Sequence, residues 1–286
     1  MSRRPPLPPR SVALLACPVC GAALAATPDD AGLRCATGHA FDRARQGYVT
    51  LLPPGHRPPS GDSAEMVADR VAFLSGGAYA GVTEALTTAV LADGDPATLL
   101  DLGGGTGHHL AGVLDRLPRA AGLVLDSSPY AARRAARAHP RAMAVVADSW
   151  ARLPVRDGAV DRVLVVFAPR NGPEIARVLR PDGRLVVVTP AADHLAELVA
   201  PLGLLRVDPD KAARLAGALE PHLSPVRAAA HREILCLDHA AVRTLVGMGP
   251  HARHLHPGTL AAAMAALPDP VCVTVAVDIA GYAAAG

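Results

Sequence analysis

The strongest constraint on the fold lies between residues 98 and 203, where short apolar runs alternate with amphipathic helical patterns. The apolar runs span 98–102, 122–125, 142–147, 162–167 and 184–189, and the helical patterns between them span 108–117, 129–138, 172–180 and 191–203. Such alternation predicts an α/β fold with a parallel sheet covered by helices on both faces. Two later runs, 233–237 and 271–279, are expected to add edge strands, which gives a mostly parallel sheet of seven strands.

The chain of 286 residues is predicted to divide into four segments. Residues 1–12 form an Arg/Pro-rich tail that we expect to be disordered, and residues 13–52 form a small unit rich in Cys and Gly. Residues 53–62 contain two Pro-Pro pairs and are predicted to be an extended linker. The main domain spans 63–286 and is expected to begin with helices at 63–74 and 79–91.

The small N-terminal unit carries two ligand pairs typical of a metal site. Cys17 and Cys20 form a C-x2-C pair, and Cys35 and His39 form a C-x3-H pair, with fourteen residues between the two pairs. Zn²⁺ takes four such ligands in a tetrahedron, and four protein ligands leave no position for a reacting water. The pattern therefore predicts one structural zinc, which would supply folding free energy that so small a unit lacks. The alternative is a set of unrelated reduced cysteines.

The other cysteines and the hydropathy bear on the compartment. Cys236 and Cys272 lie inside apolar runs and are expected to be small buried residues. Five cysteines, three of them clustered, suit a reducing compartment better than a disulfide framework. No apolar run reaches the length of about 18 residues that a membrane-spanning helix needs. We therefore expect a cytoplasmic protein without a membrane partner.

The turn after residue 102 has a spacing that indicates the cofactor. Gly103, Gly105 and Gly107 give G-x-G-x-G, whereas the dinucleotide pattern needs glycine at 108. Three carboxylates end three successive strands at the same sheet edge, where ligands of open α/β sheets bind. S-adenosylmethionine suits them, because its ribose hydroxyls, adenine amino group and amino-acid portion need acceptors and close backbone approach. The carboxylates are Asp101, Asp126 for the ribose and Asp148 for the adenine, although each alone could be a turn or cap residue.

Several segments together resemble the 23S ribosomal RNA (guanine-N1)-methyltransferases, and especially the type II branch associated with tylosin resistance in Gram-positive bacteria. The resemblance is carried by the Cys/His cluster and by segments 38–42, 46–52, 62–67, 103–109, 166–171 and 189–195. It covers roughly residues 14–280. It implies a class I S-adenosylmethionine-dependent methyltransferase, with a Rossmann-like sheet, that carries a zinc-binding domain for RNA recognition at its N-terminus.

The resemblance also implies a reaction and further site residues. A methyl group would pass to N1 of a guanine in a domain II hairpin loop of 23S rRNA, near the peptide exit tunnel, and would affect tylosin-type macrolide susceptibility. Tyr79, Gly105, Thr106 and His194 would contact the cofactor. Without the resemblance, Tyr79 could be a packing aromatic and His194 a helix cap. The family also suggests a homodimer.

Segment 167–171 follows the fourth strand and is expected at the same edge as the glycine turn. Guanine N1 carries a proton that has to leave, so stabilisation of negative charge at O6 is needed. We hypothesise that Phe167 stacks on the guanine base or forms one side of its pocket. Arg170 or Asn171 would contact O6 or the RNA backbone. Phe167 could instead simply end a core strand, and no residue stands out as the general base.

The distribution of charge favours RNA contact at the N-terminus. The net charge is only +2, but residues 1–60 hold seven Arg and three Asp, net +4, against 21 basic and 23 acidic residues in the remainder, net −2. The N-terminal unit and the histidine-rich segment 251–256 are the candidates for RNA contact, although that segment could be a solvated loop. Two alternatives compete with an rRNA methyltransferase. A small-molecule methyltransferase would not need a basic zinc unit, and a non-enzymatic RNA-binding module would not need an intact glycine turn.

Overall fold

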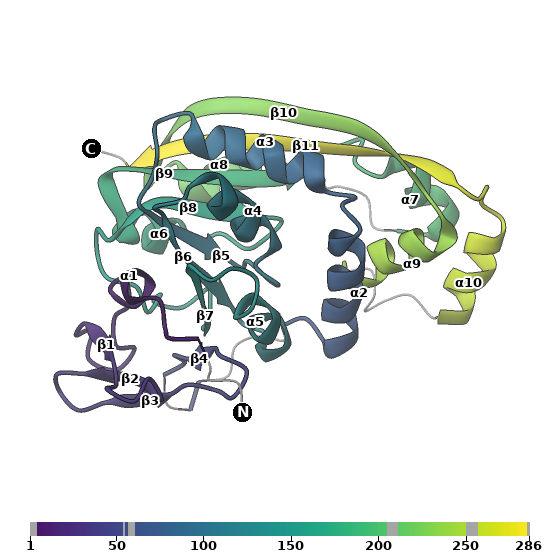
Figure 1. Cartoon of the computed structure of the whole chain (residues 1–286). Helices are drawn as coiled ribbons and strands as arrows, with labels where there is room; N and C mark the ends of the chain where they lie inside the picture. The colour runs from purple at the N-terminus through teal and green to yellow at the C-terminus, as the bar shows by residue number, and fades with distance from the viewer. Residues whose placement is uncertain (1–4, 54, 57–60, 205–210, 250–256, 285–286) are drawn as a thin grey trace.

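The centre of the molecule is an eight-stranded sheet in the order β10-β11-β9-β8-β5-β6-β7-β4 (Figure 1). The computed structural model describes residues 5–53, 55–56, 61–204, 211–249 and 257–284. The strands are β4 (Val49–Thr50), β5 (Thr98–Leu102), β6 (Ala121–Asp126), β7 (Ala142–Val146), β8 (Val160–Val166), β9 (Leu179–Pro190), β10 (Leu223–Leu237) and β11 (Val271–Ala284). β11 alone runs opposite to the other seven strands, and it pairs antiparallel with β9 and β10. The predicted mostly parallel α/β fold is confirmed, and the seven predicted strands are present together with an eighth, β4. Of the two strands expected at an edge, β10 forms the edge and β11 lies between β10 and β9.

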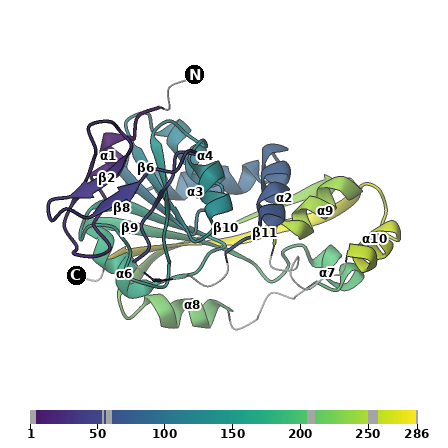
Figure 2. The same ribbon diagram turned by 90° about the horizontal axis from the view of Figure 1, so that it is seen from below.

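Helices cover both faces of the sheet, as predicted (Figure 2). Alternate residues of a strand enter opposite cores, so that Leu99 packs in one core and Leu100 in the other. The first core includes residues of α2 (Ala64–Ser75), α3 (Ala80–Leu91), α4 (His108–Arg116), α5 (Pro129–Ala135), α7 (Ala196–Leu202), α9 (His239–Gly247) and α10 (Pro257–Ala265). The second includes residues of α1 (Pro9–Val12), α6 (Gly172–Val178) and α8 (Lys211–Leu219). The sequence patterns do not predict α8, α9 and α10.

The predicted disorder of residues 1–12 is wrong for the part that the structure describes. Residues 9–12 form α1, which begins with Pro at its first position, where the missing N–H costs nothing. Leu7 and Ser11 are buried, and Ser11 Oγ donates to Gly122 O at 2.8 Å. A helix of four residues has no periodicity to detect, and it is fixed by burial against the main sheet.

The N-terminal lobe, residues 13–48, contains a small antiparallel sheet of β1 (Leu24–Ala26), β2 (Gly32–Cys35) and β3 (Ala40–Asp42). The lobe is continuous with the main domain. Leu15 forms a β-bridge with Val155, and β4 pairs with β7 through Val49 and Val145. The predicted boundary at residue 52 therefore does not separate the two units, because β4 belongs to the main sheet.

Cys236 and Cys272 form a disulfide, so their prediction as buried reduced residues is wrong. They lie directly opposite each other in the β10–β11 pair, and both are exposed. Both side chains are on the solvent-exposed face of the strands, although the sequence around them is apolar.

No helix in the described ranges is long and apolar enough to cross a membrane.

Candidate functional site

A cavity of about 800 Å³ lies at the carboxyl ends of β5, β6 and β8. It brings together ten of the twelve residues predicted for cofactor and base: Tyr79, Asp101, Gly103, Gly105, Thr106, Asp126, Asp148, Phe167, Arg170 and His194. Gly107 and Asn171 do not line it. The histidine-rich segment 251–256 lies outside the described residues. The cavity is therefore built largely from residues at the sheet edge that the sequence indicates.

The glycine turn approaches its neighbours too closely for a side chain. A Cβ on Gly104 would lie 2.4 Å from Asp101 Oδ2, and one on Gly103 would lie 2.6 Å from the Cβ of Ala168. Gly107 has a left-handed φ of 75° and caps the N-terminus of α4. Its function is thus to turn the chain into the helix, which explains why it does not line the cavity.

Asp126 holds the glycine turn in place. Its Oδ2 accepts from Gly105 N at 2.9 Å, and its Oδ1 accepts from Ser128 N at 2.8 Å. Burial nevertheless raises the pKa of Asp126. The carboxylate therefore lies beside the turn with both oxygens oriented by backbone groups, where it could also accept from a ribose hydroxyl.

Asp101 is a second carboxyl group of the cavity with a perturbed pKa. It is buried, and its Oδ1 has no hydrogen-bond partner. Burial, together with the nearby Asp126, raises the pKa of Asp101 to about 7. A buried acceptor without a partner is costly, so this position suits a cationic or donor group of a bound cofactor.

Asp148 already has two partners. Its Oδ2 lies 2.7 Å from His56 Nε2, and its Oδ1 accepts from Trp150 N at 2.8 Å. The predicted adenine acceptor is thus in the cavity wall, with its carboxylate fixed by a histidine that precedes the main domain.

An aromatic wall faces these carboxylates. Tyr79 Oη lies 3.3 Å from His194 Nε2, and the rings of Tyr79 and His194 lie 6.3 Å and 6.0 Å from that of Phe167. Ala276 N donates to His194 Nδ1, so a neutral His194 carries its proton on Nε2 and donates it to Tyr79. Burial raises the pKa of Tyr79, which keeps the phenol protonated.

Phe167 does not simply end a core strand. It follows β8 with a left-handed φ of 53° and a side chain 41% exposed at the cavity. A non-glycine residue in this region of the Ramachandran map is strained, and such strain clusters at functional sites. The ring is therefore available to a substrate base.

The structure separates the roles of Arg170 and Asn171. The Nδ2 of Asn171 donates to the carbonyl oxygens of residues 149, 150 and 151, which occupies the amide group. Arg170 lines the cavity, and its Nε is buried without a hydrogen-bond partner. Burial lowers the pKa of Arg170, but an arginine stays charged. Of the two residues predicted to contact O6, Arg170 alone lines the cavity.

Sequence reasoning missed five charged or titratable residues of the cavity, namely Asp62, Arg70, His108, His109 and Arg214. Arg70 pairs with Asp62 and donates to Met248 O at 2.8 Å, so it joins α2 to the end of α9. Burial lowers the pKa of His109 to about 3, and its Nδ1 lies 2.9 Å from Thr83 Oγ1. Helical periodicity marks the face on which Arg70 lies but not its long-range partners.

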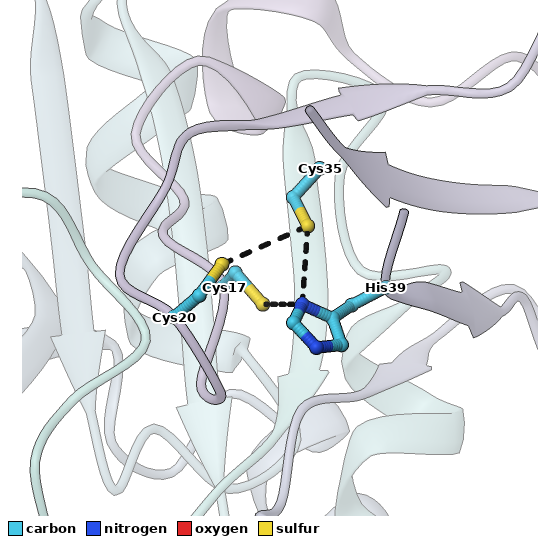
Figure 3. A group of neighbouring side chains, drawn as sticks. All are labelled: Cys17, Cys20, Cys35 and His39. Atoms are coloured by element: carbon cyan, nitrogen blue, oxygen red, sulfur yellow. Dashed lines mark hydrogen bonds between the residues drawn. The ribbon is translucent and has the colours of Figure 1, made fainter. Parts of the chain in front are cut away.

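The predicted metal ligands converge in the N-terminal lobe (Figure 3). The ligand atoms of Cys17, Cys20, Cys35 and His39 all lie within 4.8 Å of one another. Cys20 Sγ lies 3.8 Å from Cys35 Sγ, and Cys17 Sγ lies 3.6 Å from His39 Nδ1. A tetrahedron with Zn–S bonds of about 2.3 Å has S···S edges of about 3.8 Å, so the ligands fit one zinc ion. The Thr37 hydroxyl lowers the pKa of Cys35 to about 6, which favours the thiolate that binds metal.

Two family models match separate parts of the chain. Residues 15–58 match a family model described as RlmA, N-terminal, and residues 99–183 match a methyltransferase domain. Among solved structures, a complex between the Haloferax volcanii Trm112 methyltransferase activator and a methyltransferase contains a chain with TM-score 0.51 and 18% identity. The match covers 80% of this chain and 100% of that chain. The chain therefore has an N-terminal zinc ribbon and the fold of S-adenosylmethionine-dependent methyltransferases.

Two relatives match nearly the whole chain. A 23S rRNA (guanine(748)-N(1))-methyltransferase from Streptomyces fradiae is 53% identical, with coverage of 93% of this chain and 95% of the relative. A protein of Micromonospora griseorubida that bears the name 23S rRNA (guanine-N(1)-)-methyltransferase is also 53% identical, with coverage of 94% and 96%. The protein is an enzyme, and it belongs to the family of 23S rRNA (guanine-N1)-methyltransferases.

Proposed function

We propose that this protein transfers the methyl group of S-adenosylmethionine to N1 of a guanine in a domain II hairpin loop of 23S rRNA, near the peptide exit tunnel. The observation that carries the proposal is the convergence of the cofactor turn, the aromatic wall and Arg170 in one cavity, in a chain whose relative from Streptomyces fradiae is named for this chemistry. By this function the protein would act in the cytoplasm and affect susceptibility to tylosin-type macrolides. The proposed homodimer rests on the family resemblance alone.

The cavity has a suitable group for each part of S-adenosylmethionine. Asp126 would accept from the ribose hydroxyls, and Asp148 would accept from the adenine amino group. The buried Oδ1 of Asp101 has no partner and would pair with the α-ammonium group. Tyr79 and His194 would contact the amino-acid portion together with Gly105 and Thr106. The bound cofactor supplies an electrophilic methyl group on a sulfonium.

The protein would act on the guanine mainly by position and charge. Methyl transfer is an in-line displacement, in which the N1–CH₃ bond would form as the S–CH₃ bond breaks, S-adenosylhomocysteine would be the leaving group, and the N1 proton would pass to solvent. Phe167 would stack on the guanine base or form one side of its pocket, and the guanidinium of Arg170 would stabilise the negative charge that develops at O6. Asn171 would act indirectly, through the backbone of residues 149–151 to which it is bonded.

The proposed reaction is tested by primer extension. A methyl group on N1 blocks the pairing edge of guanine, so we expect reverse transcription to stop at one guanine after rRNA has been incubated with protein and S-adenosylmethionine. Calorimetry with the cofactor serves as the control for a functional binding site. Cofactor binding without a stop would favour a small-molecule methyltransferase, and RNA binding without cofactor binding would favour a non-enzymatic module.

We expect Arg170→Ala to lower kcat for rRNA methylation by about 100-fold, because a preorganised charge at O6 would be lost. The affinity for S-adenosylhomocysteine should change less than threefold. Arg170→Lys should recover part of the rate, since it keeps the charge but not the planar donor. An unchanged kcat in a folded Arg170→Ala protein would show that the charge at O6 is stabilised by another group.

A further inference from the structure

Trp150 is the single tryptophan of the chain, and it is exposed at the rim of the catalytic cavity. Its relative exposure is 60%, although a tryptophan usually buries most of its surface. It follows Asp148 by two residues and therefore lies next to the proposed adenine position. A large aromatic left in solvent beside a catalytic cavity is typical of a contact surface for a partner.

The backbone that carries Trp150 is held firmly. Asn171 Nδ2 donates to the carbonyl oxygens of Ser149, Trp150 and Ala151 at 3.2, 3.1 and 3.2 Å. Trp150 N donates to Asp148 Oδ1 at 2.8 Å. These four contacts fix the direction in which the indole leaves the main chain. Because the backbone of Trp150 is already ordered, little further backbone entropy is lost when the indole stacks on a planar group.

The segment after Trp150 leads directly to the N-terminal lobe. Ala16 N donates to Pro154 O at 3.0 Å, and Arg156 N donates to Leu14 O at 2.8 Å. Cys17, the first metal ligand, follows Ala16. Trp150 therefore begins a short segment that connects the wall of the cavity to the lobe that carries the metal site.

The N-terminal segment that this connection reaches is basic in sequence, because residues 1–60 carry a net charge of +4, from seven Arg and three Asp. Arg152, two residues after Trp150, has a side chain that is 70% exposed and forms an exposed ion pair with Asp157. Proteins that bind unpaired nucleotides combine such positive charge with aromatic rings on which bases stack.

We infer that Trp150 stacks on an unpaired base of the RNA loop next to the methylated guanine and helps to hold the loop between the cavity and the N-terminal lobe. This inference rests on the proposed function. It also explains the position of Asn171, whose amide supports the tryptophan instead of contacting the methylated base. Trp150 is thus a positioning residue for the RNA and not a catalytic residue.

The test combines kinetics with fluorescence, using a synthetic domain II hairpin of 23S rRNA. We expect Trp150→Ala to raise KM for the hairpin by about 5- to 100-fold, the usual effect of removing one stacking platform. The kcat and the affinity for S-adenosylhomocysteine should stay within about threefold. Trp150→Phe should recover most of the KM. Because Trp150 is the sole tryptophan, saturating hairpin should also quench the intrinsic tryptophan fluorescence of the wild-type protein.

Ile234→Ala is the control, because Ile234 is 73% exposed on β10 at the other end of the sheet. It should leave every parameter unchanged. An unchanged KM in Trp150→Ala, or a loss confined to cofactor affinity, would overturn the inference while wild-type methylation still supported the proposed function. If the wild-type protein does not methylate the hairpin, and its tryptophan fluorescence does not change when the hairpin is added, the proposed function and the inference fail together.

Discussion

Replacing Cys35 with serine is expected to release the zinc and to abolish rRNA methylation, with a loss of at least 100-fold in kcat/KM. The N-terminal lobe holds three short strands and few buried residues, too few to fold such a unit alone. Zinc binding supplies about 10–16 kcal/mol to comparable small units, so the loss of one ligand should unfold the lobe. No residue of the lobe lines the cavity within the described ranges. The affinity for S-adenosylhomocysteine should therefore change by less than about fivefold.

Three measurements on one preparation separate the two effects: zinc content by elemental analysis, methylation by primer extension, and cofactor affinity by calorimetry. The double variant Cys236→Ser/Cys272→Ser is the matched control, because it removes two cysteines far from the metal site. It should keep one zinc per chain. Full methylation by a Cys35→Ser protein that has lost its zinc would contradict the structural role of the metal.

Features that depend on a short segment of sequence were predicted correctly. The metal ligands form two pairs, each within five residues, and the glycine turn joins a strand directly to a helix. The carboxylates Asp101, Asp126 and Asp148 meet because parallel strands end at the same edge. In each case the local spacing of residues, or the geometry of a parallel sheet, is sufficient to predict which side chains lie close together.

Features that depend on long-range partners could not be predicted. The sequence suggests a catalytic role for Asn171. In the structure, however, its side-chain amide donates hydrogen bonds to carbonyl groups about twenty residues earlier in the chain. Cys236 and Cys272 are 36 residues apart, and only the register of the β10–β11 pair brings them together. α1 has too few residues for any period, and its place is fixed by burial and by the hydrogen bond from Ser11 to Gly122 O.

Asp101→Asn is expected to weaken the binding of S-adenosylhomocysteine at pH 8 by about 10- to 100-fold, the usual value of a hydrogen bond to a charged group. The wild-type affinity should also depend on pH. Because burial and the nearby Asp126 raise the pKa of Asp101 to about 7, the carboxyl group is protonated in the free protein below that pH. An α-ammonium group needs the ionised form, so binding must release a proton there. The affinity should rise about tenfold per pH unit below pH 6.5 and level off above pH 7.5.

The variant should remove this dependence, since an asparagine does not titrate, whereas Asp148→Asn should weaken binding but keep the slope. The stability of the free protein gives an independent check. An unfolded Asp ionises near pH 4, so the stability that protonated Asp101 contributes is fully present below pH 4 and is lost as pH rises through about 7. Free Asp101→Asn should therefore melt at a higher temperature than the wild type at pH 8, although it binds the cofactor more weakly. A wild-type affinity that stays level from pH 5.5 to 8 would rule out a pairing of Asp101 with the ammonium group, because no ionisation of this carboxyl group would then accompany binding.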